Sequence, residues 1–303
     1  MGRYAVLLVV LGSCLWGTDS VFRRPLSEEL SPVTIVFLEH LILSLLLLPF
    51  LGDIRSILGG LTRRHVAALL FISIGGSVVA TSIFTYGIKY GNPSVVVLLQ
   101  KTQPVFAVLL ARLFLGEKPK AWFWLCLAPA LAGAALVSVP DLKTGVQLDT
   151  QARLSIPAAL GAACLWGSST VFGRYVVLRL PALKLTGLRL MTALPVLTVL
   201  FVIQPPARRA LPVRASSIAL LVAMALVSSL AGLILYYRGL RETRASVASV
   251  AEAAFPLTAV ILNWLALGIG LAPVQLAGAS LLVVSITLLS YLSCRSPKTA
   301  PAQ

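Results

Sequence analysis

Charged residues are scarce in this chain of 303 residues, in which Asp, Glu, Lys and Arg together make up only 12%. A soluble domain usually carries about 25% charged residues, whereas 58% of the residues here are hydrophobic. Acidic residues are the scarcer kind, so the net charge is +15. The Lys and Arg residues stand in ones to threes between long apolar runs. This pattern indicates a membrane protein and argues against a nucleic-acid-binding surface.

Histidine and cysteine are also rare, which excludes several kinds of site. The two histidines and four cysteines form none of the closely spaced pairs that zinc sites and redox motifs use. The sequence has no glycine-rich phosphate loop, no paired-histidine zinc motif and no nucleophile elbow. We therefore expect no enzyme activity, no metal site and no organic cofactor.

Long apolar runs dominate what is present. A helix needs about 20 mostly apolar residues to cross a bilayer, and runs of this length alternate with short segments of charged and turn-forming residues. We predict ten transmembrane helices, at residues 4–22, 33–51, 65–88, 93–111, 121–139, 154–173, 183–203, 216–237, 246–267 and 273–293. The connections are too short to hold a soluble domain.

The positions of Lys and Arg predict the orientation of these helices. With the N-terminus inside, the inner segments hold most of the basic residues, although Arg23, Arg24 and the cluster at 208–214 fall outside. Basic residues are enriched in cytoplasmic segments of membrane proteins. We therefore expect both termini to be cytoplasmic, in a cell (inner) membrane, with residues 296–303 as a short cytoplasmic tail.

Two segments repeat nearly the same sequence. CLWGTDSVFRR at 14–24 and CLWGSSTVFGR at 164–174 share seven of eleven residues at an offset of 150. A weaker echo at an offset of 152 aligns Gly87, Ser94, Val95 and Pro104 with Gly239, Ser246, Val247 and Pro256. Five helices is an odd number, so the second copy enters the membrane from the opposite side. We predict an all-α integral membrane protein with two inverted-topology five-helix repeats, residues 1–145 and 150–295, as in many secondary transporters.

These motifs resemble the EamA-type branch of the drug/metabolite transporter superfamily. LWGTDSVFRR, LWGSSTVFGR and YGNPSVVVLLQKTQPVFAVLLARLFLGEK carry the resemblance, with PVQLAGASLLV in the last helix. The resemblance implies a ten-helix exporter of amino acids, other metabolites or drugs. Glu39-His40 stands where the family usually has Arg, matched here by Arg189. Gly268-Ile269 stands where the first half has Gly116-Glu117.

Charged side chains inside the predicted helices are the first candidates for function. They are Asp19, Glu39, Lys101, Arg189 and Glu252. A charge at this depth costs roughly 2.5 to 3.5 kcal/mol, so each should face a partner or a water-filled cavity. The repeat aligns Glu39 with Arg189, and Gln100 beside Lys101 with Glu252. We hypothesise ion pairs Glu39–Lys101 and Arg189–Glu252, either as part of the substrate path or as fixed structural pairs.

Proline and glycine mark positions where helices break or approach closely. Pro104 and Pro256 occupy equivalent positions, and a proline is tolerated in a membrane helix where the irregular backbone lines a cavity. We predict that these two broken helices face each other across the substrate path. Trp16-Gly17 and Trp166-Gly167 are predicted to supply cavity walls and close approaches. Anchoring of the two tryptophans at the membrane interface is the alternative.

The sequence thus predicts a secondary transporter that moves a small organic solute by alternating access. The predicted substrate-binding residues are Trp16, Glu39, Gln100, Lys101, Gln103, Trp166, Arg189, Tyr236 and Glu252. Predicted hinges or helix breaks are Gly17, Pro104, Gly167 and Pro256, and candidate proton-coupling residues are Glu39, His40 and Glu252. Charges of both signs beside aromatic walls suit an amino acid or related zwitterion, and the resemblance implies export. The expected partners are this solute, the lipid bilayer and protons as coupling ion. A channel-like or uncoupled facilitator, or an exporter of drugs or other non-zwitterionic metabolites, is the alternative.

Overall fold

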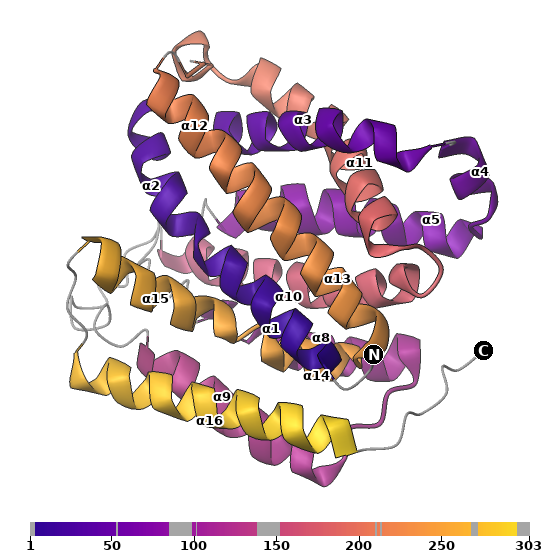
Figure 1. The fold of residues 1–303 in the computed structure, drawn as a ribbon, viewed down its shortest axis with the longest axis vertical. Coiled ribbons are helices and arrows are strands. Elements are labelled where there is room, and N and C mark those ends of the chain that lie inside the picture. Colours follow the sequence, from indigo (N-terminus) through magenta and orange to yellow (C-terminus); the bar gives the residue numbers. More distant parts are fainter. Residues whose placement is uncertain are drawn as a thin grey trace.

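The described part of the chain is built from helices alone (Figure 1). A computed structural model describes residues 4–52, 54–84, 99–100, 102–137, 152–209, 211–212, 214–267 and 272–295. Most described residues of the ten predicted runs are helical, with turns at Thr18, Thr102 and residues 252–253. Within these described ranges, six helices are long and apolar enough to span a membrane: Ala5–Arg23, Pro32–Leu51, Arg63–Phe84, Ile156–Val177, Ala182–Ile203 and Ala215–Glu242. Shorter apolar helices lie at Gln103–Leu115, Ala121–Gly133 and Pro273–Leu289.

The helices of the two halves of the chain are as follows. The first half contains α1 (Ala5–Gly17), α2 (Asp19–Glu29), α3 (Pro32–Leu51), α4 (Ile54–Gly59), α5 (Arg63–Leu70), η2 (Phe71–Val79), α8 (Gln103–Leu115) and α9 (Ala121–Val137). The second contains α10 (Ala152–Val177), α11 (Ala182–Ile203), η4 (Pro206–Arg208), α12 (Ala215–Ala223), η5 (Met224–Ala231), α13 (Gly232–Glu242), α14 (Ala245–Ala251), α15 (Ala254–Leu267) and α16 (Pro273–Arg295).

The repeated Trp-Gly motif has a different local structure in each half. α1 ends at Gly17, and the Thr18 hydroxyl donates a hydrogen bond of 2.6 Å to the Leu15 carbonyl before α2 begins. In contrast, α10 continues through Gly167 without a break. The helix has no break at Gly167, and the predicted hinge function of this residue stays a prediction. A Cβ there would lie 2.8 Å from the Gln103 carbonyl oxygen, so this glycine serves the close approach of α8.

Proline lies at the start of a new helix in both predicted broken segments. Pro104 is in the first turn of α8, where its missing N–H costs nothing. α14 ends at Ala251 and α15 begins at Ala254, so Pro256 lies in the first turn of α15. Both prolines thus lie where the structure begins a new helix, and their function as hinges stays a prediction.

A π-helix interrupts the third predicted helix of each half, a feature that the sequence did not predict. η2 and η5 begin at Phe71 and Met224, close to the offset of 152 seen in the sequence. In a π-helix the backbone hydrogen bonds span one more residue than in an α-helix, and such turns are rare and often lie at functional sites. Both π-helices contribute residues to the cavity described below.

The two halves are interleaved. α1 packs against α13, α3 against α11, α8 against α10, and α9 against α16, and the last pair lies side by side at one edge of Figure 1. Glycines permit the closest of these approaches, because a Cβ on Gly12 would lie 2.7 Å from the Gly232 carbonyl oxygen. Large apolar side chains such as Leu113, Leu125 and Leu265 are exposed on the outside, as expected for contact with lipid.

Candidate functional site

A cavity of about 550 Å³ lies among helices of both halves. It gathers all eight predicted substrate-binding residues that the structure describes: Trp16, Glu39, Gln100, Gln103, Trp166, Arg189, Tyr236 and Glu252. His40 and Pro104 also line it. The ninth predicted residue, Lys101, lies outside the described residues, so its predicted pairing with Glu39 stays a prediction.

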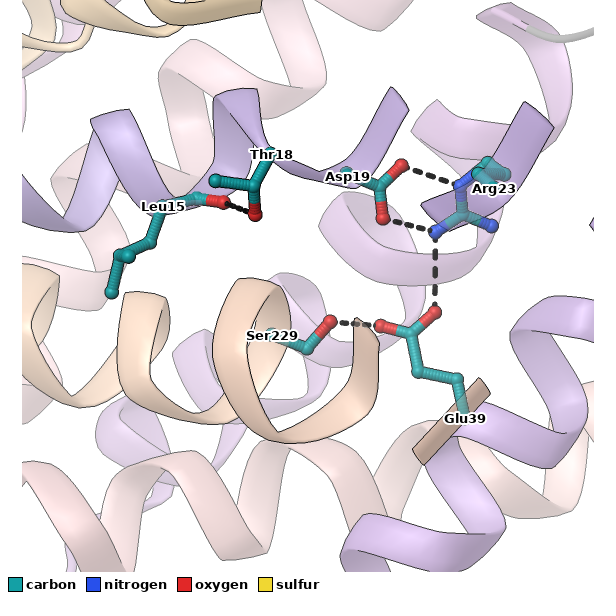
Figure 2. A network of polar contacts seen from close by, with 6 residues as sticks. All are labelled: Leu15, Thr18, Asp19, Arg23, Glu39 and Ser229. Atoms are coloured by element: carbon teal, nitrogen blue, oxygen red, sulfur yellow. Dashed lines mark hydrogen bonds and ion pairs between the residues drawn. The ribbon is translucent and has the colours of Figure 1, made fainter. Parts of the chain in front are cut away.

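One group of charges on the cavity wall is centred on Arg23 (Figure 2). Its guanidinium donates to both carboxylate oxygens of Asp19, at 2.5 Å and 2.8 Å, and to Glu39 Oε2 at 3.3 Å. Ser229 of η5 donates to the other oxygen of Glu39. Glu39 therefore has Arg23 as a cationic partner, which the sequence had placed in an outer segment. Arg23 reaches the cavity because it lies inside α2, which continues to Glu29. Arg23 and Asp19 are four residues apart and therefore share one face of this helix.

Glu252 forms a second polar group at the break between α14 and α15. Its carboxylate accepts hydrogen bonds from Tyr236 Oη at 2.7 Å, Gln103 Nε2 at 2.7 Å and Thr170 Oγ1 at 2.9 Å. Gln100 in turn donates to Gln103 at 2.9 Å. Because Gln103 begins α8, the two broken helices contact each other directly at this point. All three donors to Glu252 are neutral.

Arg189 is also held by neutral groups. Its Nε donates to Ser77 Oγ at 2.9 Å and its Nη1 to Tyr237 Oη at 2.7 Å. Its guanidinium carbon lies 6.0 Å from the centre of the Tyr237 ring, within the range of a cation–π contact. The predicted ion pair Arg189–Glu252 is therefore wrong as a direct contact, because hydroxyl and amide groups occupy both side chains. The cavity wall thus carries a cation and an anion whose hydrogen-bond partners here are neutral.

The serines of the two π-helices make equivalent contacts. Ser77 in η2 and Ser229 in η5 are 152 positions apart, which is the offset of the second sequence echo. Ser77 accepts from Arg189 of the second half, whereas Ser229 donates to Glu39 of the first half. Each π-helix therefore contacts the ionisable residue of the opposite half, and Glu39 and Arg189 were the aligned pair in the sequence. The equivalence was predictable from the repeat, but the contacts were not.

Aromatic side chains supply two further parts of the wall. Trp16 and Tyr236 have ring centres 4.8 Å apart, and Phe84 and Trp166 have ring centres 5.2 Å apart. Trp166 Nε1 donates to the Gly76 carbonyl in η2 at 2.9 Å. Both tryptophans line the cavity, which favours the predicted wall position over interface anchoring.

His40 is held on one side only. Its Nδ1 lies 2.9 Å from the Val36 carbonyl oxygen, so that nitrogen carries the proton, and its buried Nε2 has no partner within the described residues.

Apart from Arg23, the residues that sequence reasoning missed are hydroxyl-bearing ones: Ser77, Thr170 and Ser229. Among the described side chains, no cluster of three or more His, Cys, Asp or Glu residues is arranged to hold a metal ion.

Comparisons with known proteins match the chain along most of its length. The model of the EamA-like transporter family matches twice, over residues 3–139 and 153–291. The riboflavin transporter ImpX of Fusobacterium nucleatum is 31% identical over 294 residues, which cover 95% of this chain and 97% of that protein. The pseudopaline exporter CntI of Pseudomonas aeruginosa is 30% identical over 139 residues, 46% of this chain and 47% of its own. A protein of known crystal structure has the same fold, with a TM-score of 0.79 at 17% identity over 96% of this chain and 98% of its own.

Proposed function

The chain belongs to the EamA-like transporter family, and we propose that it moves a small organic solute through its central cavity by alternating access. It is an integral membrane protein, and its named relatives transport small molecules. The cavity walls come from both halves, which is the arrangement expected where two inverted repeats enclose one site. The double match of the family model supports two five-helix repeats. From the distribution of Lys and Arg we propose that both termini are cytoplasmic.

The observation that carries the proposal is which groups Arg189 and Glu252 contact. Both line the cavity, their charges are opposite, and the hydrogen bonds that hold them come from neutral groups. A buried charge is costly unless it is paired. A zwitterion would supply both partners, with its carboxylate on Arg189 and its ammonium on Glu252, while Trp16 and Tyr236 contact its side chain. We therefore propose an amino acid or a related zwitterionic metabolite as substrate, with export as the direction.

A planar aromatic solute is the second candidate substrate. The relative that spans nearly the whole chain is named for riboflavin, and the Trp16–Tyr236 and Phe84–Trp166 pairs offer flat apolar surfaces. A volume of about 550 Å³ lies within the range of about 300 to 1,000 Å³ typical of sites for drug-sized ligands. Such a solute would use the aromatic walls more than the two charges.

Counterflow into liposomes that hold the purified protein tests the proposal and separates these substrates. Liposomes loaded with unlabelled solute receive labelled amino acids in one assay and labelled riboflavin in another. Saturable exchange of an amino acid supports the zwitterion, and saturable exchange of riboflavin alone replaces it with the planar substrate. Flux that rises linearly with concentration would indicate a channel-like facilitator and contradict alternating access.

Replacing Glu252 with glutamine is expected to remove any response of uptake to an imposed pH gradient. Glu252 is the candidate proton carrier that the geometry favours, because a carboxylate held by neutral donors can take up a proton without leaving a cation unpaired. Glu39, in contrast, contacts the cation Arg23, so Glu39→Gln is the matched control and should keep the response. Labelled uptake with and without the gradient measures the effect. A response that survives in Glu252→Gln would assign the proton to another group.

A further inference from the structure

Glu117 is a buried carboxylate outside the cavity wall. It follows Gly116, whose positive φ of 63° ends α8 and turns the chain back, so that the Glu117 N–H donates to the Ala111 carbonyl at 3.1 Å. A left-handed glycine commonly ends a helix in this way, with the following N–H groups turned back toward its last carbonyls. The sequence "LGE" thus places the carboxylate just beyond the end of α8 and toward the second half.

The Glu117 carboxylate closes the start of α14. It accepts from the backbone N–H groups of Ala245 at 2.7 Å and Ser246 at 3.1 Å, and from Ser246 Oγ at 2.7 Å. These groups have no partner inside their own helix. Arg174 at the end of α10 lies 3.6 Å from the same carboxylate and donates to the carbonyls of Leu240, in the last turn of α13, and Thr243, just after it. Directly and through Arg174, the Glu117 carboxylate therefore connects the ends of α8, α10 and α13 with the start of α14.

The other end of α14 is held by Glu252 and its hydrogen-bond donors. All seven residues of α14 are buried, and Glu252 caps its C-terminal end. α8 and α14 are thus linked twice: Gln103 at the start of α8 donates to Glu252, and Glu117 beyond the end of α8 accepts from Ala245 and Ser246. The two helices form a closed frame with a carboxylate at each end. Only the Glu252 end of this frame lines the cavity.

The frame supplies part of the cavity wall. Ser249 and Val250 line it, whereas Ala245 to Ala248, Glu117 and Arg174 do not. On the proposed topology the Glu117 end faces the cytoplasm, and the lining residues Asp19 and Arg23 lie toward the outside. At the equivalent place in the second half, the sequence has Ile269 in place of a glutamate. The sequence therefore places a glutamate at this position in the first half and not at the aligned position in the second. We call the contacts of Glu117 with Ala245, Ser246 and Arg174 the carboxylate clamp.

We propose that Glu117 is a positioning residue for transport: it holds α14 so that Glu252 faces the cavity, and it keeps the inner end closed until α8 and α14 separate. This rests on the proposed function in taking Glu252 as part of the site, and on the proposed topology in taking the Glu117 end as the inner one. A substrate group that takes the place of Gln103 on Glu252 would open one end of the frame, and release of Glu117 would open the other.

Labelling of a cysteine in place of Ser249 tests the clamp without any substrate. In a variant lacking the native cysteines, Ser249→Cys is exposed to a membrane-impermeant maleimide applied from each side of the membrane separately. Glu117→Ala should raise the rate of labelling from the inner side about tenfold or more, since one hydrogen bond to a charged group is worth a factor of that order. Lys118→Ala, an exposed neighbour, is the matched control and should leave the rate unchanged.

A second variant keeps the test open if Glu117→Ala does not fold. Ser246→Ala removes one of the three hydrogen bonds and leaves the buried charge paired, so we expect a smaller increase from the same side. Rates equal to the Lys118→Ala control in both folded variants would overturn the clamp. Because the assay needs no transport, this failure is distinct from a failure of counterflow, which would reject the substrate proposal instead.

Discussion

Replacing Arg189 with glutamine is expected to abolish saturable exchange of a zwitterion while leaving the protein folded. The guanidinium is held by Ser77 and Tyr237, so its removal strands no buried carboxylate among its contacts. The substrate carboxylate, in contrast, loses its cation. Truncation of one member of such a charge pair costs about 2 to 5 kcal/mol, which is a loss of at least about thirtyfold in affinity. Concentration-dependent counterflow measures the loss.

Two further variants show whether the loss comes from binding. Arg189→Lys keeps the charge without the two-point geometry and should restore part of the exchange. Tyr237→Phe removes one hydrogen bond that orients the guanidinium, so it should weaken exchange less than Arg189→Gln does. Unchanged half-saturation in Arg189→Gln would remove this residue from the site.

Replacing Arg23 with glutamine is expected to destabilise the folded protein. Asp19 and Glu39 would then face each other across the cavity wall without their shared cation. Removing one partner of a buried pair costs about 3 to 5 kcal/mol, and we expect about 2 kcal/mol here because the Arg23 side chain is 33% exposed and partly screened by water. The thermal midpoint in detergent and the yield of monodisperse protein report the effect.

The double variant Arg23→Gln/Glu39→Gln is the control for this second result. It removes the cation together with one of the carboxylates that repel each other, so it should recover part of the lost stability. If Arg23→Gln is as stable as the native chain, the contacts of Arg23 with Asp19 and Glu39 do not stabilise the fold. Its place on the cavity wall would then favour a function in substrate binding.

The features that the sequence predicted well are those with a local physical cause. Apolar runs long enough for a bilayer coincide with helices, and the two prolines mark helix starts because their missing N–H is tolerated there. The cavity residues were also predictable one by one. A charged side chain in an apolar segment must avoid lipid, so Glu39, Arg189 and Glu252 all turn toward the interior cavity.

The partners of these residues were not predictable, because they lie on other helices and some of them, Ser77, Ser229 and Gln103, lie in the other half. Both hypothesised ion pairs were drawn within one repeat, but Arg189 contacts Ser77, and Glu39 contacts Ser229, across the halves. A repeat in the sequence shows which residues are equivalent and gives no information on which ones touch. The π-helices add to the difficulty, since they change the helix face on which every later residue falls. Gly167 likewise allows either a kink or a close approach, and only the position of α8 decides between them.

The π-helices also bear on the history of the chain. Each acts as an extra residue in an otherwise α-helical segment, and η2 and η5 stand at matching places in the two halves. Two independent insertions at one position are improbable. If one ancestral five-helix unit was copied, that unit already carried the extra residue, and the copying came later. In an ancestor made of two identical subunits, the same irregular turn would have stood on both sides of the central space. The charges at Glu39 and Arg189 would then have diverged after the genes fused. A symmetric cavity would thereby have become one with opposite charges at its two aligned positions.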